Sequence, residues 1–214
     1  MGKQADIGVY DALHEAVEAD GGARAEAIYQ RLFSTIRDLV RASGAKSVLE
    51  VGCGSGLFAE LLLREAPVAY RGFDFSPVGV AYARSRVPQA DFFVGNALSA
   101  DSYRGDYDCI ICAEVLEHIH DDREVVSLWP RGTWTVCSVP NFDYPTHVRH
   151  FRTEAEVRER YGVAMDIHSI HRVSAPAIAG RTALEYARRL MRARRDPKKL
   201  LGLLGVNAFD WNAG

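Results

Sequence analysis

The stretch SVLEVGCGSGLF, residues 47–58, combines a strand pattern, a glycine-rich turn and the start of a helix. The apolar run over residues 47–51 predicts a short buried strand, and residues 57–65 predict a helix. Between them, Gly52, Gly54 and Gly56 alternate with small residues. Glycines in such a turn let the backbone bend tightly and come close to a ligand. The stretch therefore predicts an α/β unit with a ligand site at its turn.

Strand and helix signals go on alternating after this turn. This alternation predicts a doubly wound α/β fold with a mainly parallel sheet. Strands are expected over residues 47–51, 69–73, 91–94, 107–112 and 133–139, and helices over residues 24–42, 57–65, 76–86, 114–128 and 153–161. Two further strands, expected over residues 165–173 and 206–211, bring the expected number of strands to about seven.

Length and composition indicate one globular domain. The chain has 214 residues, of which 48% are hydrophobic and 25% charged, values typical of a domain with a substantial core. The formal net charge of −2 argues against a protein that coats nucleic acid uniformly. We expect an N-terminal helical segment (1–45), a ligand-binding core (46–161) and a C-terminal strand with a basic helix (162–214).

The sequence also bears on location. It has no apolar run near the roughly 20 residues of a membrane span, and its first residues lack the pattern of a signal peptide. We therefore expect a cytoplasmic protein.

Cys109 and Cys112 have a CxxC spacing, but the side chains of residues three apart on a strand point to opposite faces. Apolar packing is therefore the favoured interpretation of these cysteines.

Four separated motifs then follow in a fixed order: residues 50–56, 72–76, 95–97 and 107–118. In these motifs the chain resembles the class I S-adenosylmethionine-dependent methyltransferases, over roughly residues 46–161. The resemblance implies that S-adenosylmethionine is the cofactor. A nucleotide-fold protein without its ligand and a hydride-transfer enzyme are the alternatives. The cofactor-binding residues that the resemblance implies are Glu50, Gly52, Cys53, Gly54, Gly56, Asp74, Phe75, Asn96, Ala97, Ala113 and Glu114.

Asp74 is the acidic residue of this set with a clear role. It ends the second expected strand, 22 residues after Gly52, where a carboxylate can accept hydrogen bonds from both ribose hydroxyls of an adenosine. Asn96 stands where members of the family often have Asp. Its side-chain carbonyl oxygen could still accept a hydrogen bond from the adenine amino group.

Glu114, Glu117 and His118 form a second pattern. On the helix expected over residues 114–128 they would occupy positions i, i+3 and i+4, which share one face. Two carboxylates and an imidazole can hold a divalent cation such as Mg²⁺ or Mn²⁺. His147, in the loop after the fifth expected strand, is the preferred fourth ligand. His150 is the alternative ligand, or a general base acting alone.

In the Glu-x-x-Glu-His block and the downstream histidine, the chain is similar to two groups of methyltransferases. These are the ubiquinone-biosynthesis O-methyltransferases and the small-RNA terminal 2′-O-methyltransferases, and both act on vicinal hydroxyls. The resemblance implies an acceptor oxygen on a small molecule, with His118, His147 and His150 as candidate catalytic residues. A terminal-ribose RNA methyltransferase, a metal-independent N- or O-methyltransferase and a non-catalytic binding module remain alternatives.

Residues 181–199 predict a basic helix. The segment has eight basic and two acidic residues, a local net charge of +6, which leaves −8 for the rest of the chain. It could be a solvated face, bind an anionic membrane surface at which the protein would be peripheral, or contact RNA phosphates. Because Tyr186 is the single aromatic residue interleaved with the charges, a membrane is favoured over RNA.

Overall fold

The computed structural model describes residues 4–174. In this part of the chain five strands form one sheet in the order β3-β2-β1-β4-β5, and every neighbouring pair is parallel. The doubly wound α/β fold predicted from the sequence is thereby confirmed. The strands are β1 (Ser47–Val51), β2 (Ala69–Asp74), β3 (Asp91–Val94), β4 (Cys109–Cys112) and β5 (Trp134–Cys137).

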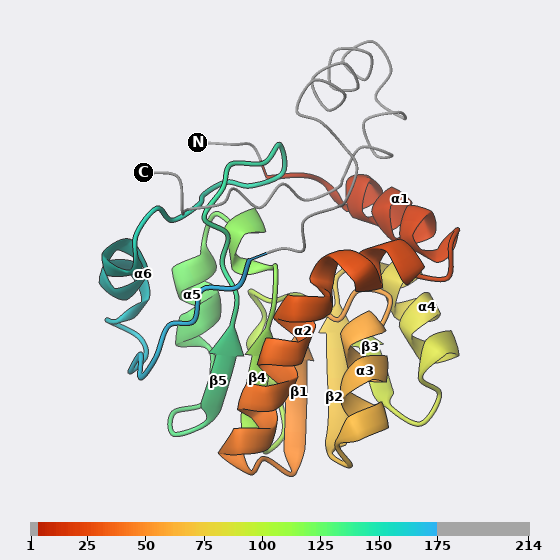
Figure 1. The fold of residues 1–214 in the computed structure, drawn as a ribbon, viewed down its shortest axis with the longest axis horizontal. Helices are drawn as coiled ribbons and strands as arrows, with labels where there is room; N and C mark the ends of the chain where they lie inside the picture. Colours follow the sequence, from red (N-terminus) through yellow and green to blue (C-terminus); the bar gives the residue numbers. More distant parts are fainter. Residues whose placement is uncertain (1–3, 175–214) are drawn as a thin grey trace.

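Helices connect and cover these strands. Because all strands are parallel, their carboxyl ends meet at one edge of the sheet, and α1 lies across that edge (Figure 1). Among the described helices, none is long and apolar enough to cross a membrane. The helices are α1 (Ile7–Glu18), α2 (Ala23–Ser43), α3 (Leu57–Glu65), α4 (Pro77–Arg86), α5 (Asp122–Ser127) and α6 (Glu154–Tyr161), with two 3₁₀ turns, η1 (Ala100–Tyr103) and η2 (Leu116–His118).

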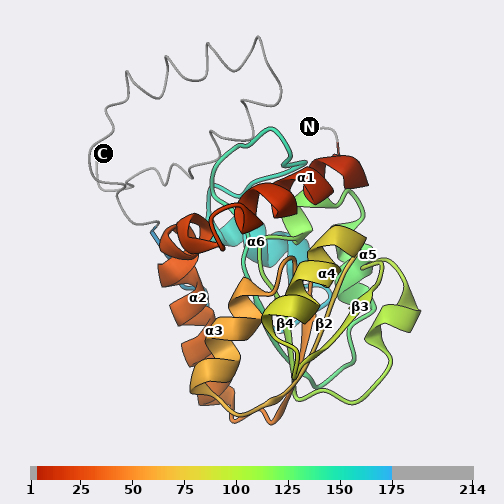
Figure 2. The same cartoon turned by 90° about the vertical axis from the view of Figure 1, so that its right-hand side faces the viewer.

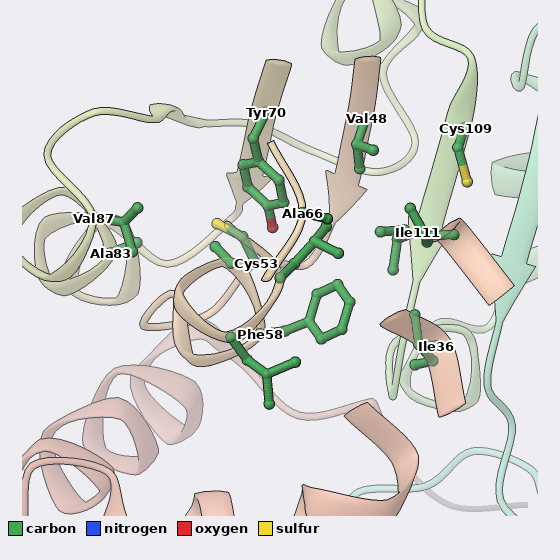
Figure 3. Packing of buried hydrophobic residues seen from close by; sticks show 14 of the residues in the cluster. Ile36, Val48, Cys53, Phe58, Ala66, Tyr70, Ala83, Val87, Cys109 and Ile111 are labelled. Atoms are coloured by element: carbon green, nitrogen blue, oxygen red, sulfur yellow. The ribbon is translucent and has the colours of Figure 1, made fainter. Parts of the chain in front are cut away.

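The two faces of the sheet pack into separate apolar clusters, because successive side chains of a strand point to opposite faces. Val48 lies in a cluster with residues of α2, α3 and α4, whereas Leu49 lies in a cluster with residues of α5 and α6. Figure 2 shows α2 and α3 together on one side of the sheet. Figure 3 shows the first cluster, where Phe58 of α3 packs with Ile36 of α2 and Ile111 of β4.

Local signals in the sequence explain two helix starts. The Ser76 hydroxyl accepts a hydrogen bond from the Gly79 amide at 2.9 Å, and Pro77 occupies the first turn of α4, as expected for an N-cap followed by proline. The Thr153 hydroxyl accepts from the Glu156 amide at 3.2 Å at the start of α6. Ser76 and Thr153 are therefore the N-caps of α4 and α6.

The single helix expected over residues 114–128 is wrong. Glu114 has φ +58°, a left-handed conformation that a helix cannot contain. The chain instead forms the 3₁₀ turn η2, and α5 begins only at Asp122. The left-handed bend brings the Glu114 amide to the Ser138 hydroxyl, which accepts its hydrogen bond at 2.8 Å.

The strand expected over residues 165–173 is also wrong. These residues have no strand conformation, and among the described residues the sheet ends at β5. Met165 and Ile167 pack against the second apolar cluster, so their alternation reflects a segment that covers the core without strand pairing. The strand expected over residues 206–211 and the basic helix over residues 181–199 lie outside the described residues.

Candidate functional site

The glycine-rich turn between β1 and α3 is attached to the end of β2. The amides of Gly52 and Cys53 both donate to the Phe73 carbonyl, at 2.8 and 2.9 Å. Gly52, Gly54 and Gly56 all have positive φ, of 73°, 49° and 80°, a backbone conformation that non-glycine residues rarely adopt. The turn therefore needs glycine for its conformation, and it presents bare backbone at the carboxyl edge of the sheet.

Asp74 is held rigidly beside this turn. Its side chain is almost fully buried, and its two oxygens accept from the Gly54 amide at 3.0 Å and the Ser76 amide at 2.9 Å. Each carboxylate oxygen has a second lone pair, so the group can still accept hydrogen bonds from a ligand. The next residue, Phe75, is 40% exposed and offers an apolar surface to an adenine ring.

Asn96 and Ala97 follow β3 at the same edge. The Asn96 side-chain oxygen accepts from the Leu98 amide at 2.9 Å, and the Ala97 carbonyl accepts from the Tyr103 hydroxyl at 2.7 Å. These bonds fix the loop that the resemblance places at the adenine rim. They also show that one lone pair of the Asn96 oxygen is already used within the protein.

Glu50 and Cys53 point away from the edge and into the core. The Tyr70 hydroxyl donates to the Glu50 carboxylate, and burial raises the pKa of Glu50 to about 8. Cys53 is buried in the apolar cluster with Tyr70. If these two residues contribute to cofactor binding, they do so through the backbone and through the shape of the turn.

Helix α1 contributes side-chain contacts to this edge. The Tyr10 ring lies 5.0 Å from the Phe75 ring and 5.6 Å from the His118 ring. The Ser76 hydroxyl donates to Asp11 at 2.5 Å. His14 lies over the turn, since a Cβ at Gly54 would be 3.1 Å from its ring.

No residue of α1 is buried, so hydrophobic periodicity gave no sign that this helix docks on the site. The available signal was the helical spacing of Tyr10, Asp11 and His14, which places them along one side of the helix.

Glu117, His118 and His147 come together below α1. Their ligand atoms all lie within 4.8 Å of one another. Glu117 is fully buried, and neither of its carboxylate oxygens has a hydrogen-bond partner among the described residues. A buried carboxylate without partners is costly. A divalent cation is the kind of group that would satisfy it, so the donor set fits a metal.

The two histidines present suitable lone pairs. The Nδ1 atoms of His118 and His147 lie 3.0 Å from the Thr146 carbonyl and 3.3 Å from the Phe142 carbonyl. A carbonyl can only accept, so each Nδ1 carries the proton and each Nε2 keeps a free lone pair. This is the usual way in which a second contact orients a metal-binding imidazole.

Burial sets the charge state of this group. It raises the pKa of Glu117 well above its ordinary value, with a contribution from the nearby Glu114. It lowers the pKa of His118, and burial together with His118 lowers the pKa of His147 to about 4. Both imidazoles are therefore neutral near pH 7, the form that binds metals.

The other candidates lie around this group. Glu114 is outside it, and the Ser138 hydroxyl donates to its carboxylate at 2.7 Å. Ala113 packs beside the first apolar cluster at the end of β4. His150 is half-buried and lines a groove that also contains His147. The structure thus gathers most of the predicted site at one edge of the sheet, with Glu50 and Cys53 on its core side.

Comparison with known proteins places this site in a family. The family model described as "Methyltransferase domain" matches residues 23–180. A probable S-adenosylmethionine-dependent methyltransferase of Mycolicibacterium smegmatis is 36% identical over 125 residues, which cover 55% of this chain and 44% of the relative. The ubiquinone biosynthesis O-methyltransferase of Escherichia coli is 40% identical over 92 residues, covering 40% of this chain and 38% of that protein.

Two further similarities are more distant. The small RNA 2′-O-methyltransferase of Arabidopsis thaliana is 29% identical over 137 residues, covering 55% of this chain and 14% of that protein. The SAM-bound structure of magnesium protoporphyrin IX methyltransferase from Synechocystis has a TM-score of 0.55 at 18% identity, covering 77% of this chain and 88% of that one. This likeness shows the shared fold.

The matched region spans less than half the length of each of the three sequence relatives. The family model, by contrast, matches most of this chain and includes the glycine-rich turn, Asp74 and the Glu117–His147 group. The chain therefore belongs to the methyltransferase-domain family, among the class I S-adenosylmethionine-dependent methyltransferases.

Proposed function

We propose that this protein transfers a methyl group from S-adenosylmethionine to an oxygen of a small molecule, one of two adjacent hydroxyls, with the help of a divalent cation. Glu117, His118 and His147 would hold the cation. The observation that carries the proposal is the convergence of these three residues within 4.8 Å around a fully buried carboxylate that has no hydrogen-bond partner among the described residues.

The chain's own residues have distinct tasks in this reaction. Asp74 would accept hydrogen bonds from the ribose, and the backbone of Gly52 and Gly54 would lie along the methionine part of the cofactor. Bound S-adenosylmethionine would supply an electrophilic methyl group, and a cation held by Glu117, His118 and His147 would lower the pKa of the attacking hydroxyl. The protein's contribution is orientation, because it holds acceptor and donor in line.

The names of two relatives support an oxygen acceptor. One is a ubiquinone biosynthesis O-methyltransferase and the other a small RNA 2′-O-methyltransferase. We favour a small molecule because the groove beside His147 and His150 has mixed charge, with Arg123, Asp143, Glu156 and Glu159 among its lining residues. A polyanion would favour an unbroken basic track. Anionic-membrane binding through residues 181–199 remains a proposal of its own.

The metal part is tested by titration with Mn²⁺. Glu117→Gln keeps the shape of the side chain but loses the anionic ligand, so the variant should lose at least about tenfold in Mn²⁺ affinity. S-adenosylhomocysteine affinity should remain within about twofold of wild type. Glu124→Gln, on the exposed side of α5, is the matched control and should bind both ligands normally.

The acceptor part is tested with pairs of small molecules that differ by one hydroxyl. Catechol-like compounds should be methylated, as followed by mass spectrometry, and their monohydroxy analogues should react much more slowly. Equal rates for both members of a pair would contradict the vicinal-hydroxyl proposal. Methylation of a 3′-terminal ribose in short RNA, in preference to every catechol, would establish the RNA alternative. Cofactor binding without any Mn²⁺ binding would leave a metal-independent enzyme with His147 or His150 as base.

A further inference from the structure

Arg149 connects the two chain segments that supply the candidate metal ligands. It lies two residues after His147, and its guanidinium donates to three backbone carbonyls of the neighbouring segment. The Nη1 atom lies 2.8 Å from the Leu116 oxygen and 2.5 Å from the Ile119 oxygen, and Nη2 lies 2.8 Å from the His120 oxygen. These carbonyls surround Glu117 and His118 in the chain.

Asp122 holds this guanidinium in place. Its carboxylate is fully buried and lies 2.9 Å from Nη1 of Arg149. It also accepts from Nε and Nη2 of Arg160, at 2.8 and 2.5 Å, and from the Tyr161 hydroxyl at 2.6 Å. Two arginines therefore share one carboxylate, and the carbonyls that Arg149 contacts take up part of the excess positive charge.

Two further hydrogen bonds join the same two segments. The Val148 amide donates to the Glu117 carbonyl at 2.8 Å, and His118 donates to the Thr146 carbonyl. Both bonds lie directly at the ligand residues. In the described structure the His118 and His147 rings also lie 5.0 Å apart, but Arg149 supplies three further hydrogen bonds between the two segments.

We propose that Arg149 is a positioning residue, which sets the separation of His147 from Glu117 and His118 and so prepares the site for its cation. The proposal rests on the proposed metal-assisted function. A planar guanidinium can reach three carbonyls and a carboxylate at once, because its five donors are fixed in a fork. A lysine ammonium in the same place cannot, although it keeps the charge.

Arg149→Lys is therefore the test variant, and Arg160→Lys is its matched control. Arg160 binds the same Asp122 carboxylate, but it has no hydrogen bond to the carbonyls of residues 116–120 in the described structure. Arg149→Lys should lose about tenfold or more in Mn²⁺ affinity, as expected for a residue that orients metal ligands. Arg160→Lys should stay within about twofold of wild type, and S-adenosylhomocysteine affinity should change little in both.

A second measurement needs no metal. Hydrogen exchange of the Val148 amide should become faster in Arg149→Lys than in Arg160→Lys, because the clamp around its bond to Glu117 is loosened. Arg149→Gln serves as the second variant if Arg149→Lys does not fold. Unchanged exchange of Val148, or equal losses of Mn²⁺ affinity in both lysine variants, would overturn the proposal. If wild type binds no Mn²⁺, the proposed function fails, and the exchange experiment still decides whether Arg149 orders this loop.

Discussion

Replacing Gly52 with alanine is expected to destabilise the protein more than the same change at any open turn. Gly52 has φ +73°, and a Cβ placed there would lie 2.3 Å from Cγ2 of Val115. The left-handed conformation costs alanine about 1–2 kcal/mol, and forcing an extra carbon against a packed side chain costs about 1–3 kcal/mol more. After the gain of about 0.5–1 kcal/mol from a less flexible unfolded chain, we expect a loss of about 1–4.5 kcal/mol in the free energy of unfolding.

Gly132→Ala is the matched control, because Gly132 has φ +83° and nothing lies within 4 Å of its Cβ position. This variant should show the conformational cost alone, about 1 kcal/mol after the gain from a less flexible unfolded chain. Urea unfolding of both variants measures the difference. Gly52 belongs to the cofactor turn, and Val115 lies two residues before the candidate metal ligand Glu117. A displacement of Val115 by the new Cβ should therefore also weaken the binding of S-adenosylhomocysteine and Mn²⁺.

A double variant separates crowding from other causes. Val115→Ala removes the atom that meets the new Cβ, so Gly52→Ala combined with Val115→Ala should cost less than the sum of the single changes, by about 1 kcal/mol or more. Equal stability of the Gly52→Ala and Gly132→Ala proteins would refute this reasoning. So would strict additivity of Gly52→Ala and Val115→Ala.

Three further predictions concern the cofactor edge and its support. The pKa of Glu50 is raised to about 8 in the folded protein, so protonation of Glu50 favours the folded state. Its contribution to the free energy of unfolding is full below about pH 4.5 and is lost as the pH rises to about 8. Glu50→Gln should flatten this decline in stability, as measured by urea unfolding between pH 5 and 8. Glu18 forms an ion pair with Arg86, and the two side chains are only 19% and 14% exposed. Glu18→Gln should therefore speed hydrogen exchange in α1 and lower the free energy of unfolding by about 1 kcal/mol. Asp74→Asn should lower S-adenosylhomocysteine affinity by about tenfold or more, because a charged acceptor is worth more than a neutral one; unchanged titrations would exclude Asp74 as the ribose ligand.

The sheet and its connections could be predicted because their signals are local. The apolar run at Val48 and Leu49, the glycines of the turn and the cap at Ser76 each specify a strand, a turn or a helix start within a few residues. Parallel topology then brings the carboxyl ends of β1, β2, β4 and β5 together. This is why Asp74 and the His147 loop could be expected at one edge.

The segment from Glu114 to His118 could not be predicted in the same way. Its acidic and apolar spacing matches a helix, but Glu114 adopts a left-handed conformation stabilised by its hydrogen bonds with Ser138. Ser138 lies 24 residues away, so the deciding contact is tertiary. Likewise, no hydrophobic periodicity in the sequence indicates that α1 lies over the turn, because the helix docks through polar and aromatic contacts such as those of Tyr10 and His14.

The most direct test of the account is isothermal titration of the purified protein with S-adenosylhomocysteine, in the presence of Mn²⁺ and in the presence of a chelator. The account predicts micromolar binding of S-adenosylhomocysteine, together with a separate Mn²⁺ isotherm that disappears in Glu117→Gln and persists in Glu124→Gln. Absence of S-adenosylhomocysteine binding under both conditions would contradict the central claim that the edge formed by the glycine-rich turn and Asp74 is a cofactor site.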